Sequence, residues 1–226
     1  MSTAILSIRP QPGAQATCQT GAEMGLEITP YPLSRIEPLA WEAPDPATID
    51  ALLIGSANAI RHGGESLRAL RGKPVFAVGR STAAVAKSAG FTVQLAGQGG
   101  LQELLSRIPA GRVRLLRIAG RDHVPLQLPE QVSMETRIAY AAQDVAMPDP
   151  MQAQLAEGAL VLLHSAGSAR HLRAECERLN LDLGAIAIAA LGPRIADAAG
   201  EGWARIGTAP QPTDQALLAL AADMCH

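Results

Sequence analysis

Short apolar runs recur along the whole chain and are separated by segments whose apolar residues have helical spacing. Runs of this length suit buried parallel strands, and their alternation with helical segments is typical of β–α–β units. The pattern therefore predicts an α/β fold. The predicted strands lie within residues 4–8, 51–55, 74–79, 91–96, 112–120, 159–164, 185–192 and 203–209.

Helix start signals follow most of these predicted strands directly. Ser, Gly or Thr stands near the start of each helical segment, where an N-cap residue is favoured. Gly90 and Gly202 stand where a helix C-cap is expected, and an aromatic residue follows each of them to begin the next strand. The clearest predicted helices lie within residues 56–70, 79–90, 165–179 and 212–224.

The sequence also contains pairs of similar segments that are separated by roughly 110 residues. Such repetition predicts two copies of one α/β unit. One pair breaks the order: the N-terminal ILSIRP resembles LLRIAGR, which comes late in the first copy, so the N-terminal residues are expected to belong with the C-terminal copy. The other pairs are FAVGRSTAAVAKSAGF (76–91) with AALGPRIADAAGEGW (189–203), DALLIGSANAI (50–60) with GALVLLHSAGSA (158–169), and GLQELLSRI (100–108) with TDQALLALA (213–221).

The composition agrees with a folded protein of two domains. The 226 residues exceed the common size of one domain. Because 48% of the residues are hydrophobic and only 3% are aromatic, Ala, Leu, Val and Ile must build the core. A formal net charge of −2 supplies no basic field, which argues against nucleic acid as a partner.

The cysteines and the N-terminus indicate the compartment. The three cysteines stand far apart and outside any CxxC motif, which is typical of free thiols in a reducing cytosol. The N-terminus lacks the features of a signal peptide, and no apolar segment is long enough to span a membrane. We therefore expect a cytoplasmic protein without a membrane partner, and a monomer, because no apolar helix stripe calls for a second chain.

Small and polar residues follow several predicted strands where a helix begins. In parallel α/β sheets ligands bind beyond the carboxyl ends of the strands, and the free N–H groups of helix N-termini favour anions. These loops therefore predict anion-binding sites along a cleft between two domains. As ordinary N-caps, Ser56, Thr82 and Ser165 would instead each stabilise a helix by about 1 kcal/mol. The loops are 56-SAN-58, 79-GRST-82, 165-SAGS-168 and 192-GPR-194.

Most known catalytic motifs are absent from the sequence. There is no GxGxxG after a strand, no GK[ST] phosphate loop and no GxSxG elbow. The histidines form no HExxH motif or other close pair of metal ligands. The expectation is a chemistry without an organic cofactor, a metal ion or a nucleophilic side chain.

Tyr140 is the strongest single candidate for catalysis, because a phenol can donate a proton to a leaving oxygen. It lies in the second of two irregular joints, 30–46 and 134–150, where a hinge would place it at the mouth of a cleft. A linker tyrosine that only packs its ring would look the same in the sequence. No lysine follows four residues later, which excludes the Tyr-x-x-x-Lys arrangement of dehydrogenases.

Several segments stand in a characteristic order along the chain: ILSIRP, DALLIGSANAI, FAVGRSTAAVAKSAGF, METRIAY, VLLHSAGSA, AALGP and APQPTDQALLALA. Taken together, they resemble the uroporphyrinogen-III synthase family over nearly the whole chain. The resemblance implies two parallel-sheet α/β domains, one of them flavodoxin-like and discontinuous, joined by a two-stranded linker with a cleft between them. The implied boundaries are 1–33 and 145–226 for the flavodoxin-like domain, 39–135 for the inserted domain, and 34–38 and 136–144 for the linker.

The same resemblance implies a lyase of porphyrin and heme biosynthesis. Members of this family act without metal or organic cofactor on hydroxymethylbilane, a linear tetrapyrrole rich in carboxylates. They close it with loss of water and with inversion of ring D through a spiro intermediate. Unassisted closure gives the symmetric type I product, so catalysis is largely positioning. Hydroxymethylbilane synthase is the protein expected to hand over the substrate.

Tyr140 matches the linker tyrosine of the family, and the resemblance implies that it assists the departure of hydroxide. Ile195 departs from the threonine that is common at its place, so its loop is not expected to contribute a hydroxyl. Two alternatives stay open: a non-catalytic two-domain protein that closes on a small anionic ligand, and a synthase-like protein with a degenerate site. The residues expected to bind substrate are Ser56, Ala57, Asn58, Gly79, Ser81, Thr82, Ser165, Ala166, Gly192 and Thr213.

Overall fold

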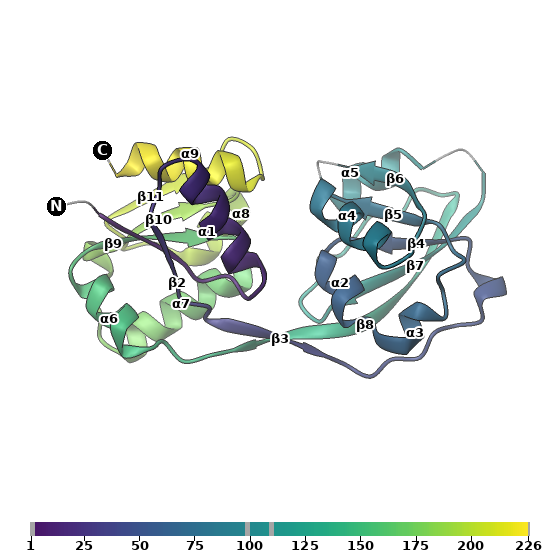
Figure 1. Cartoon of the computed structure of the whole chain (residues 1–226), viewed down its shortest axis with the longest axis horizontal. Helices are drawn as coiled ribbons and strands as arrows, with labels where there is room; N and C mark the ends of the chain where they lie inside the picture. The colour runs from purple at the N-terminus through teal and green to yellow at the C-terminus, as the bar shows by residue number, and fades with distance from the viewer. Residues whose placement is uncertain (1–2, 98–99, 109–110, 226) are drawn as a thin grey trace. The chain divides into compact units, whose positions relative to one another are not determined.

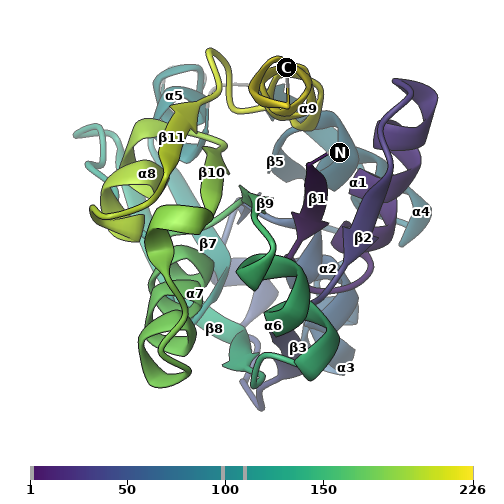
Figure 2. The ribbon, with the colours of Figure 1, turned by 90° about the vertical axis from the view of Figure 1, so that its left-hand side faces the viewer.

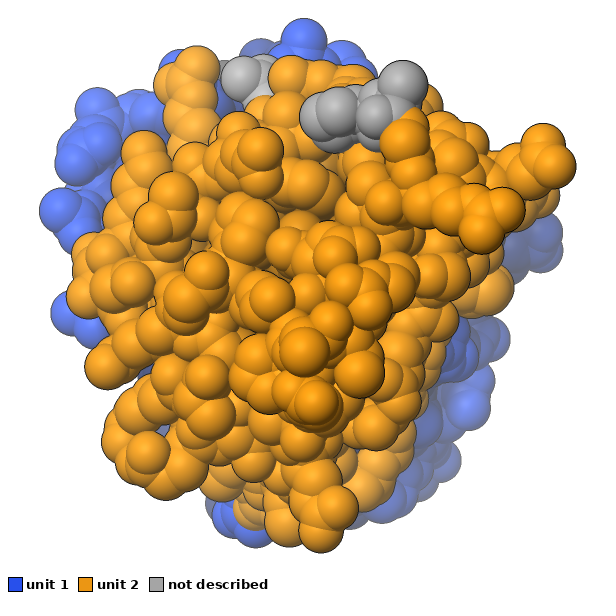
Figure 3. Space-filling model, turned by 90° about the vertical axis from the view of Figure 1, so that its right-hand side faces the viewer, with its two compact units in different colours: residues 1–35, 143–226 blue, residues 36–142 orange. Residues whose placement is uncertain are grey.

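The chain forms two compact units in the computed structural model, which describes residues 3–97, 100–108 and 111–225. Unit 1 combines residues 1–35 with residues 143–226, and unit 2 comprises residues 36–142 (Figures 1 and 3). Each unit is a mainly parallel sheet with helices packed on its faces. The predicted α/β class is therefore confirmed.

The sheet of unit 1 has the strand order β11–β10–β9–β1–β2, and its neighbouring strands run parallel. When the five strands are numbered in chain order within this unit, their order in the sheet, read from β2, is 2-1-3-4-5, as in flavodoxin. The order reverses between β1 and β9, which is the place where such sheets bind their ligands. The strands are β1 (Ala4–Ser7), β2 (Ile28–Pro30), β9 (Ala159–Leu163), β10 (Ala187–Ala190) and β11 (Arg205–Thr208).

The sheet of unit 2 has the strand order β3–β8–β7–β4–β5–β6, and the strands from β8 to β6 run parallel to their neighbours. In this unit the order reverses between β7 and β4. The strands are β3 (Ser34–Pro38), β4 (Ala51–Ile54), β5 (Val75–Val78), β6 (Val93–Gly97), β7 (Val113–Gly120) and β8 (Val132–Asp144).

The two sheets account for the repeats in the sequence. Strands β9, β10 and β11 follow one another as β4, β5 and β6 do, and β1 lies beside β9 as β7 lies beside β4. The similarity of ILSIRP to LLRIAGR thus reflects two equivalent strands. The chain passes from unit 1 to unit 2 within β3 and returns within β8, and these two strands are neighbours in one sheet.

Helices cover both faces of the unit 1 sheet (Figure 2). Because successive side chains of a strand point to opposite faces, Leu6 packs beneath α6, α7 and α8, while its neighbour Ile5 packs beneath α1 and α9. The helices are α1 (Gly13–Glu23), α6 (Asp149–Ala156), α7 (Ala166–Arg178), α8 (Pro193–Ala199) and α9 (Asp214–Met224), with a short 3-10 helix, η2 (Leu183–Ala185).

Unit 2 is built in the same way. Leu52 and Leu116 pack against α2, α3 and α4 on one face, whereas Leu53 and Leu115 pack against α5 on the other. The helices are α2 (Ala57–His62), α3 (Gly64–Arg68), α4 (Arg80–Ser88) and α5 (Leu101–Ser106), with a short 3-10 helix, η1 (Pro46–Thr48).

Two local predictions were wrong. The single helix expected over 56–70 is broken into α2 and α3, because Gly64 adopts a φ of +64° that no continuous helix allows. The C-cap of α8 is Gly200, with a φ of +72°, and Gly202 lies beyond it in the loop to β11. By contrast, Gly90 follows the end of α4 with a φ of +86°, as expected of a helix-ending glycine.

Candidate active site

Three of the predicted site residues are N-caps that bind the start of a helix through their side chains, after the carboxyl ends of strands. In unit 2, the Ser56 hydroxyl accepts a hydrogen bond from the N–H of the third loop residue, Asn58, at 3.2 Å and so caps α2. In unit 1, Ser165 caps α7 by accepting from the N–H of Ser168 at 3.1 Å, and Thr213 caps α9 through the N–H of Ala216 at 3.2 Å. Each cap satisfies one N–H group and leaves others in the first turn without a partner inside the helix.

The other predicted loops begin their helices without a side-chain cap. Gly79 caps α4 with a φ of +81°, and Gly192 caps α8 in an extended conformation. Ser81 is exposed in the first turn of α4, while Thr82 is buried, with 6% of its surface exposed. The alternative in which Thr82 is an N-cap is therefore wrong, because Thr82 is the third residue of the helix.

The remaining predicted residues lie in first turns of helices. Ala57 is buried and Asn58 is half-buried in α2, and the Asn58 carboxamide oxygen accepts a bond from the Arg61 guanidinium at 3.4 Å. Ala166 is half-buried at the start of α7.

Ile195 occupies in α8 the place that Thr82 occupies in α4, as the third residue of its helix. Its side chain is 9% exposed and belongs to the hydrophobic core of unit 1. The apolar residue at this place is therefore explained by packing.

Tyr140 lies on β8 next to the reversal point of the unit 2 sheet. It pairs with Gly120 at the end of β7, and its carbonyl accepts a hydrogen bond from the N–H of Arg121 at 2.9 Å. The phenol ring lies against Gly120 so closely that a Cβ there would be 2.6 Å from its Cε2 atom. The hydroxyl interacts with the side chain of Ser56, which follows β4. The structure thus brings together Tyr140 and Ser56, two of the predicted site residues.

The surroundings of Tyr140 keep its proton on the phenol. Burial raises the pKa of Tyr140, and the opposing interactions with Ser56, Arg117 and the Gly120 backbone do not reverse this rise. Arg117 is itself buried, and its guanidinium donates to the carbonyl of Val124 at 2.8 Å. At neutral pH the side chain of Tyr140 is therefore a neutral hydrogen-bond donor.

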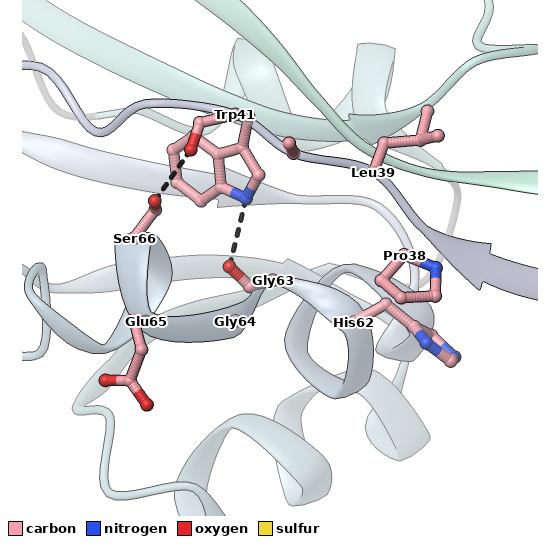
Figure 4. Close-up of a pocket in the computed structure, with 9 residues that line it drawn as sticks. Pro38, Leu39, Trp41, His62, Gly63, Gly64, Glu65 and Ser66 are labelled. Atoms are coloured by element: carbon pink, nitrogen blue, oxygen red, sulfur yellow. Dashed lines mark hydrogen bonds between the residues drawn. The ribbon is translucent and has the colours of Figure 1, made fainter.

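His62 is a neighbour of Tyr140 that the sequence did not single out. The two ring centroids are 6.3 Å apart, and burial lowers the pKa of His62. His62 also lines a hollow of about 330 Å³ within unit 2 (Figure 4). There the indole N–H of Trp41 donates to the carbonyl of Gly63 at 3.0 Å, and the Ser66 hydroxyl donates to the carbonyl of Trp41 at 2.7 Å.

The sequence also missed a polar cluster in unit 1. Arg9, Thr17 and His164 all contact the carboxylate of Asp214, the first residue of α9. Two local signals existed: His164 ends a predicted strand, and Asp214 follows Thr213 near the start of a predicted helix. Neither signal points to the other, because the partners come from distant parts of the chain.

Within the described ranges, no group of three or more His, Cys, Asp or Glu side chains is placed to hold a metal ion. Cys18, Cys176 and Cys225 are free thiols, and burial raises the pKa of each, that of Cys176 to about 11. No helix of the part that the structure describes is both long and apolar enough to cross a membrane.

Comparison with known proteins decides the family. A family model described as uroporphyrinogen-III synthase HemD matches residues 16–219, which is most of the chain. The chain belongs to the uroporphyrinogen-III synthase family. The resemblance inferred from the sequence motifs is therefore confirmed.

Solved structures of uroporphyrinogen-III synthases share the fold. The uroporphyrinogen-III synthetase of Helicobacter pylori has a TM-score of 0.63 and 16% identity, over 98% of this chain and 99% of that chain. A mutant uroporphyrinogen III synthase of the thermophilic bacterium Thermus thermophilus has a TM-score of 0.50 and 16% identity, over 99% of this chain and 98% of that chain. A search of curated proteins gave no match. At such low identity, these structures support the fold of the chain and do not assign roles to its residues.

Proposed function

We propose that this chain is a uroporphyrinogen-III synthase, a lyase that cyclises hydroxymethylbilane with loss of water and inversion of ring D through a spiro intermediate. Membership of the family supports the reaction. The observation that carries the chemistry is the phenol of Tyr140, which is protonated at neutral pH and lies beside the Ser56 hydroxyl at the end of a parallel sheet.

In this proposal Tyr140 assists the departure of the terminal hydroxyl. The phenol gives its proton to the leaving oxygen as the carbon–oxygen bond breaks, so that water leaves and an azafulvene cation forms. The substituted carbon of ring D then attacks the cation to give the spiro intermediate. The bond from this carbon to the methylene that leads to ring C then breaks, and that methylene bonds to the other α-carbon of ring D, which inverts the ring. This α-carbon then loses its proton, which restores the phenol, and the net loss is one water.

The Ser56 hydroxyl has two functions in this scheme. It accepts the N–H of Asn58 as the cap of α2, and it interacts with the Tyr140 hydroxyl. Because its interaction with Tyr140 lowers the pKa of the phenol, it also stabilises the phenolate that forms when the proton is given away. Ser56 would therefore support both the position and the acidity of the proton donor.

Binding of the substrate carboxylates is proposed for the loops that start helices. The exposed caps Ser165 and Thr213 begin long helices, whose first N–H groups and dipoles favour negative charge. Thr82 is the least exposed of the proposed set. The proposed substrate-binding residues are Ser56, Ala57, Asn58, Gly79, Ser81, Thr82, Ser165, Ala166, Gly192 and Thr213.

Positioning is the main catalytic requirement of this reaction. The linear substrate must be folded so that ring D attacks through its substituted carbon, and rigid donor groups supply such orientation without any redox step. We further propose a cytoplasmic monomer that receives hydroxymethylbilane directly from hydroxymethylbilane synthase.

The test couples the protein to hydroxymethylbilane synthase and separates the uroporphyrinogen isomers. The first enzyme without this protein gives the type I background. A synthase raises the type III fraction in proportion to its concentration. A non-catalytic binding protein would bind hydroxymethylbilane or slow its closure, and would leave the type I isomer as the product.

A further inference from the structure

A polar cluster lies at the reversal point of the unit 1 sheet. We define the Asp214 cluster as Arg9, Thr17, His164 and Asp214. Arg9 follows the end of β1 by two residues, and His164 follows β9 directly. Thr17 lies in α1, and Asp214 is the first residue of α9. The cluster therefore joins two strands and two helices at the edge where flavodoxin-like sheets bind ligands.

Both oxygens of the Asp214 carboxylate are engaged. Its Oδ2 accepts hydrogen bonds from Arg9 Nη1 at 2.8 Å and from Thr17 Oγ1 at 3.0 Å. Its Oδ1 lies 3.0 Å from His164 Nε2 and 3.1 Å from Arg9 Nη1. Arg9 also donates to Thr17 at 3.0 Å, and its guanidinium lies over Gly13, where a Cβ would be 2.5 Å from Nε. This network fixes the carboxylate in one orientation.

The protonation states follow from these contacts. Burial by itself would raise the pKa of Asp214, but His164, Arg9 and Thr17 together lower it to about 2. The carboxylate is therefore ionised, and Nε2 of His164 is the donor. Burial lowers the pKa of His164 despite the opposing effect of Asp214, so the imidazole is neutral. Its Nδ1 lies near the backbone of Leu162 and has no regular hydrogen bond among the described residues.

The cluster links two of the loops proposed to bind substrate. His164 directly precedes Ser165, the N-cap of α7, and Asp214 directly follows Thr213, the N-cap of α9. We propose that Asp214 is a positioning residue, which holds the N-termini of α7 and α9 together through His164 so that they act as one binding surface for substrate carboxylates. This inference rests on the proposed function of the chain.

Charge balance is consistent with this role. An aspartate in the first turn of a helix would repel an anionic ligand at the same N-terminus. Here the positive charge of Arg9 lies 2.8 Å away and compensates the carboxylate, so the cluster adds no net negative charge to the edge of the sheet. The side chains of Arg9 and Asp214 are about 30% exposed, so solvent weakens the contribution of this ion pair to stability.

The test compares variants in the coupled isomer assay. We expect Asp214→Asn to raise KM by about tenfold while kcat changes by less than about threefold, because the substrate would be held less well without loss of the reacting groups. His164→Ala, which removes the link from the other side, should have the same effect. His164→Gln keeps an amide donor near the place of Nε2 and should restore most of the wild-type KM. Asp223→Asn, at the far end of α9, is the matched control and should match the wild type.

Two results would overturn the inference: a wild-type KM in both Asp214→Asn and His164→Ala, or a kcat loss without a KM change in both. Hydrogen exchange at the N–H groups of Ser168 and Ala216, which the two caps bind, gives a readout that needs no reaction. We expect faster exchange at both sites in His164→Ala, and unchanged exchange would also overturn the inference. If the wild type makes no type III isomer while this exchange effect is seen, the proposed function fails and the link between the helices stands.

Discussion

Tyr140 depends for its position on two residues of other strand ends. Gly120, at the end of β7, has no side chain, so the phenol ring lies against its backbone. Ser56, after β4, caps α2 and interacts with the phenol hydroxyl. All three residues belong to unit 2. The proton donor of the proposed reaction is thus prepared within one unit, before any substrate is bound.

Tyr140→Phe tests the role of the hydroxyl. The ring and its packing stay, so substrate binding should change little, whereas the transition state loses its proton donor. We expect kcat to fall by about a hundredfold, at the low end of the range for general acids, with KM changed by less than about threefold. Single-turnover kinetics of hydroxymethylbilane closure measure the two effects separately. A variant with wild-type kcat would remove Tyr140 from the mechanism.

Gly120→Ala tests the position of the phenol without removing it. The added Cβ would lie 2.6 Å from Cε2 and 2.8 Å from Cζ of Tyr140, so the ring must move. Because misplacement of a catalytic group by about 1 Å can cost up to about a hundredfold, we expect kcat to fall by about tenfold or more.

Gly72→Ala is the matched control for this substitution. A Cβ at Gly72 has no neighbouring atom within 4 Å, and Gly72, like Gly120, has no positive φ. The control should keep wild-type kcat and a wild-type melting temperature. Equal kcat values for Gly120→Ala and the wild type would show that the contact between Gly120 and Tyr140 does not matter.

At the residue scale, the sequence predicts contacts between residues that are close together in the chain. Ser56, Ser165 and Thr213 were placed at the starts of predicted helices, where a cap bonds an N–H group two or three positions away. The Asp214 cluster was not predicted, because Arg9 and Asp214 are 205 positions apart and only the sheet order brings them together. The role of Gly120 was likewise hidden, because it depends on the register between β7 and β8.

At the scale of helices, a substitution at Thr213 can distinguish the capping of α9 from the binding of substrate. Thr213→Ala should lower the free energy of unfolding by about 1 kcal/mol through the lost cap of α9. If the start of α9 also binds a substrate carboxylate, KM should rise by about tenfold in addition. Thermal unfolding and steady-state kinetics measure the two effects on the same samples.

Asp182→Ala is the control for this prediction. Asp182 caps the short helix η2, where its carboxylate accepts the N–H of Gly184 at 2.8 Å. Its loss should cost a similar free energy of unfolding without changing KM. A KM rise of the same size in both variants would mean that loss of stability, and not loss of a ligand contact, explains the effect at Thr213.

The predicted elements are those with strong apolar patterns. All eight predicted strands are present. The central strands β4 and β9 are buried along their whole length, which requires continuous apolar residues on both faces. Helix α1 was not predicted, since it buries only the small residues Ala14, Thr17 and Gly21 and so has no apolar period. Strand β2 is three residues long and ends at Pro30, which is too short for a pattern.

At the scale of the whole molecule, stability should depend on acid pH. Asp50, Glu175 and Asp214 each have a pKa lowered to about 2, by Arg114 for Asp50, by Arg178 for Glu175 and by the Asp214 cluster for Asp214. A carboxyl group with a lowered pKa in the folded state stabilises the protein above its unfolded pKa, and this contribution is lost as pH falls towards the folded value. The melting temperature should therefore fall steadily from about pH 5 to about pH 2.

Glu175→Gln tests this dependence at one site. The Glu175 carboxylate contacts the Arg178 guanidinium at 2.7 Å and accepts the N–H of Met147 at 2.6 Å. The variant should have a lower melting temperature at neutral pH and a shallower decline in acid, measured by thermal unfolding at several pH values. The exposed Glu157, replaced by Gln, is the control and should follow the wild type. A Glu175→Gln curve parallel to the wild type would contradict the assignment.

The repeat is visible in the sequence because both units use the same order of strands and glycine turns. The sequence singled out Tyr140 in unit 2 but could not predict the charged cluster that unit 1 has instead. Unit 2 has the phenol of Tyr140 at its reversal point, and unit 1 has the charged Asp214 cluster at the equivalent place. We propose that the first of these supplies the proton and that the second orders the surface which holds the carboxylates.

The type III fraction formed with hydroxymethylbilane synthase is the most direct test of this account. Increasing amounts of the wild-type protein should shift the product from type I to type III uroporphyrinogen until type III dominates, and Tyr140→Phe should require far more protein for the same shift. A product that stays type I at every concentration of the wild-type protein would contradict the proposed function.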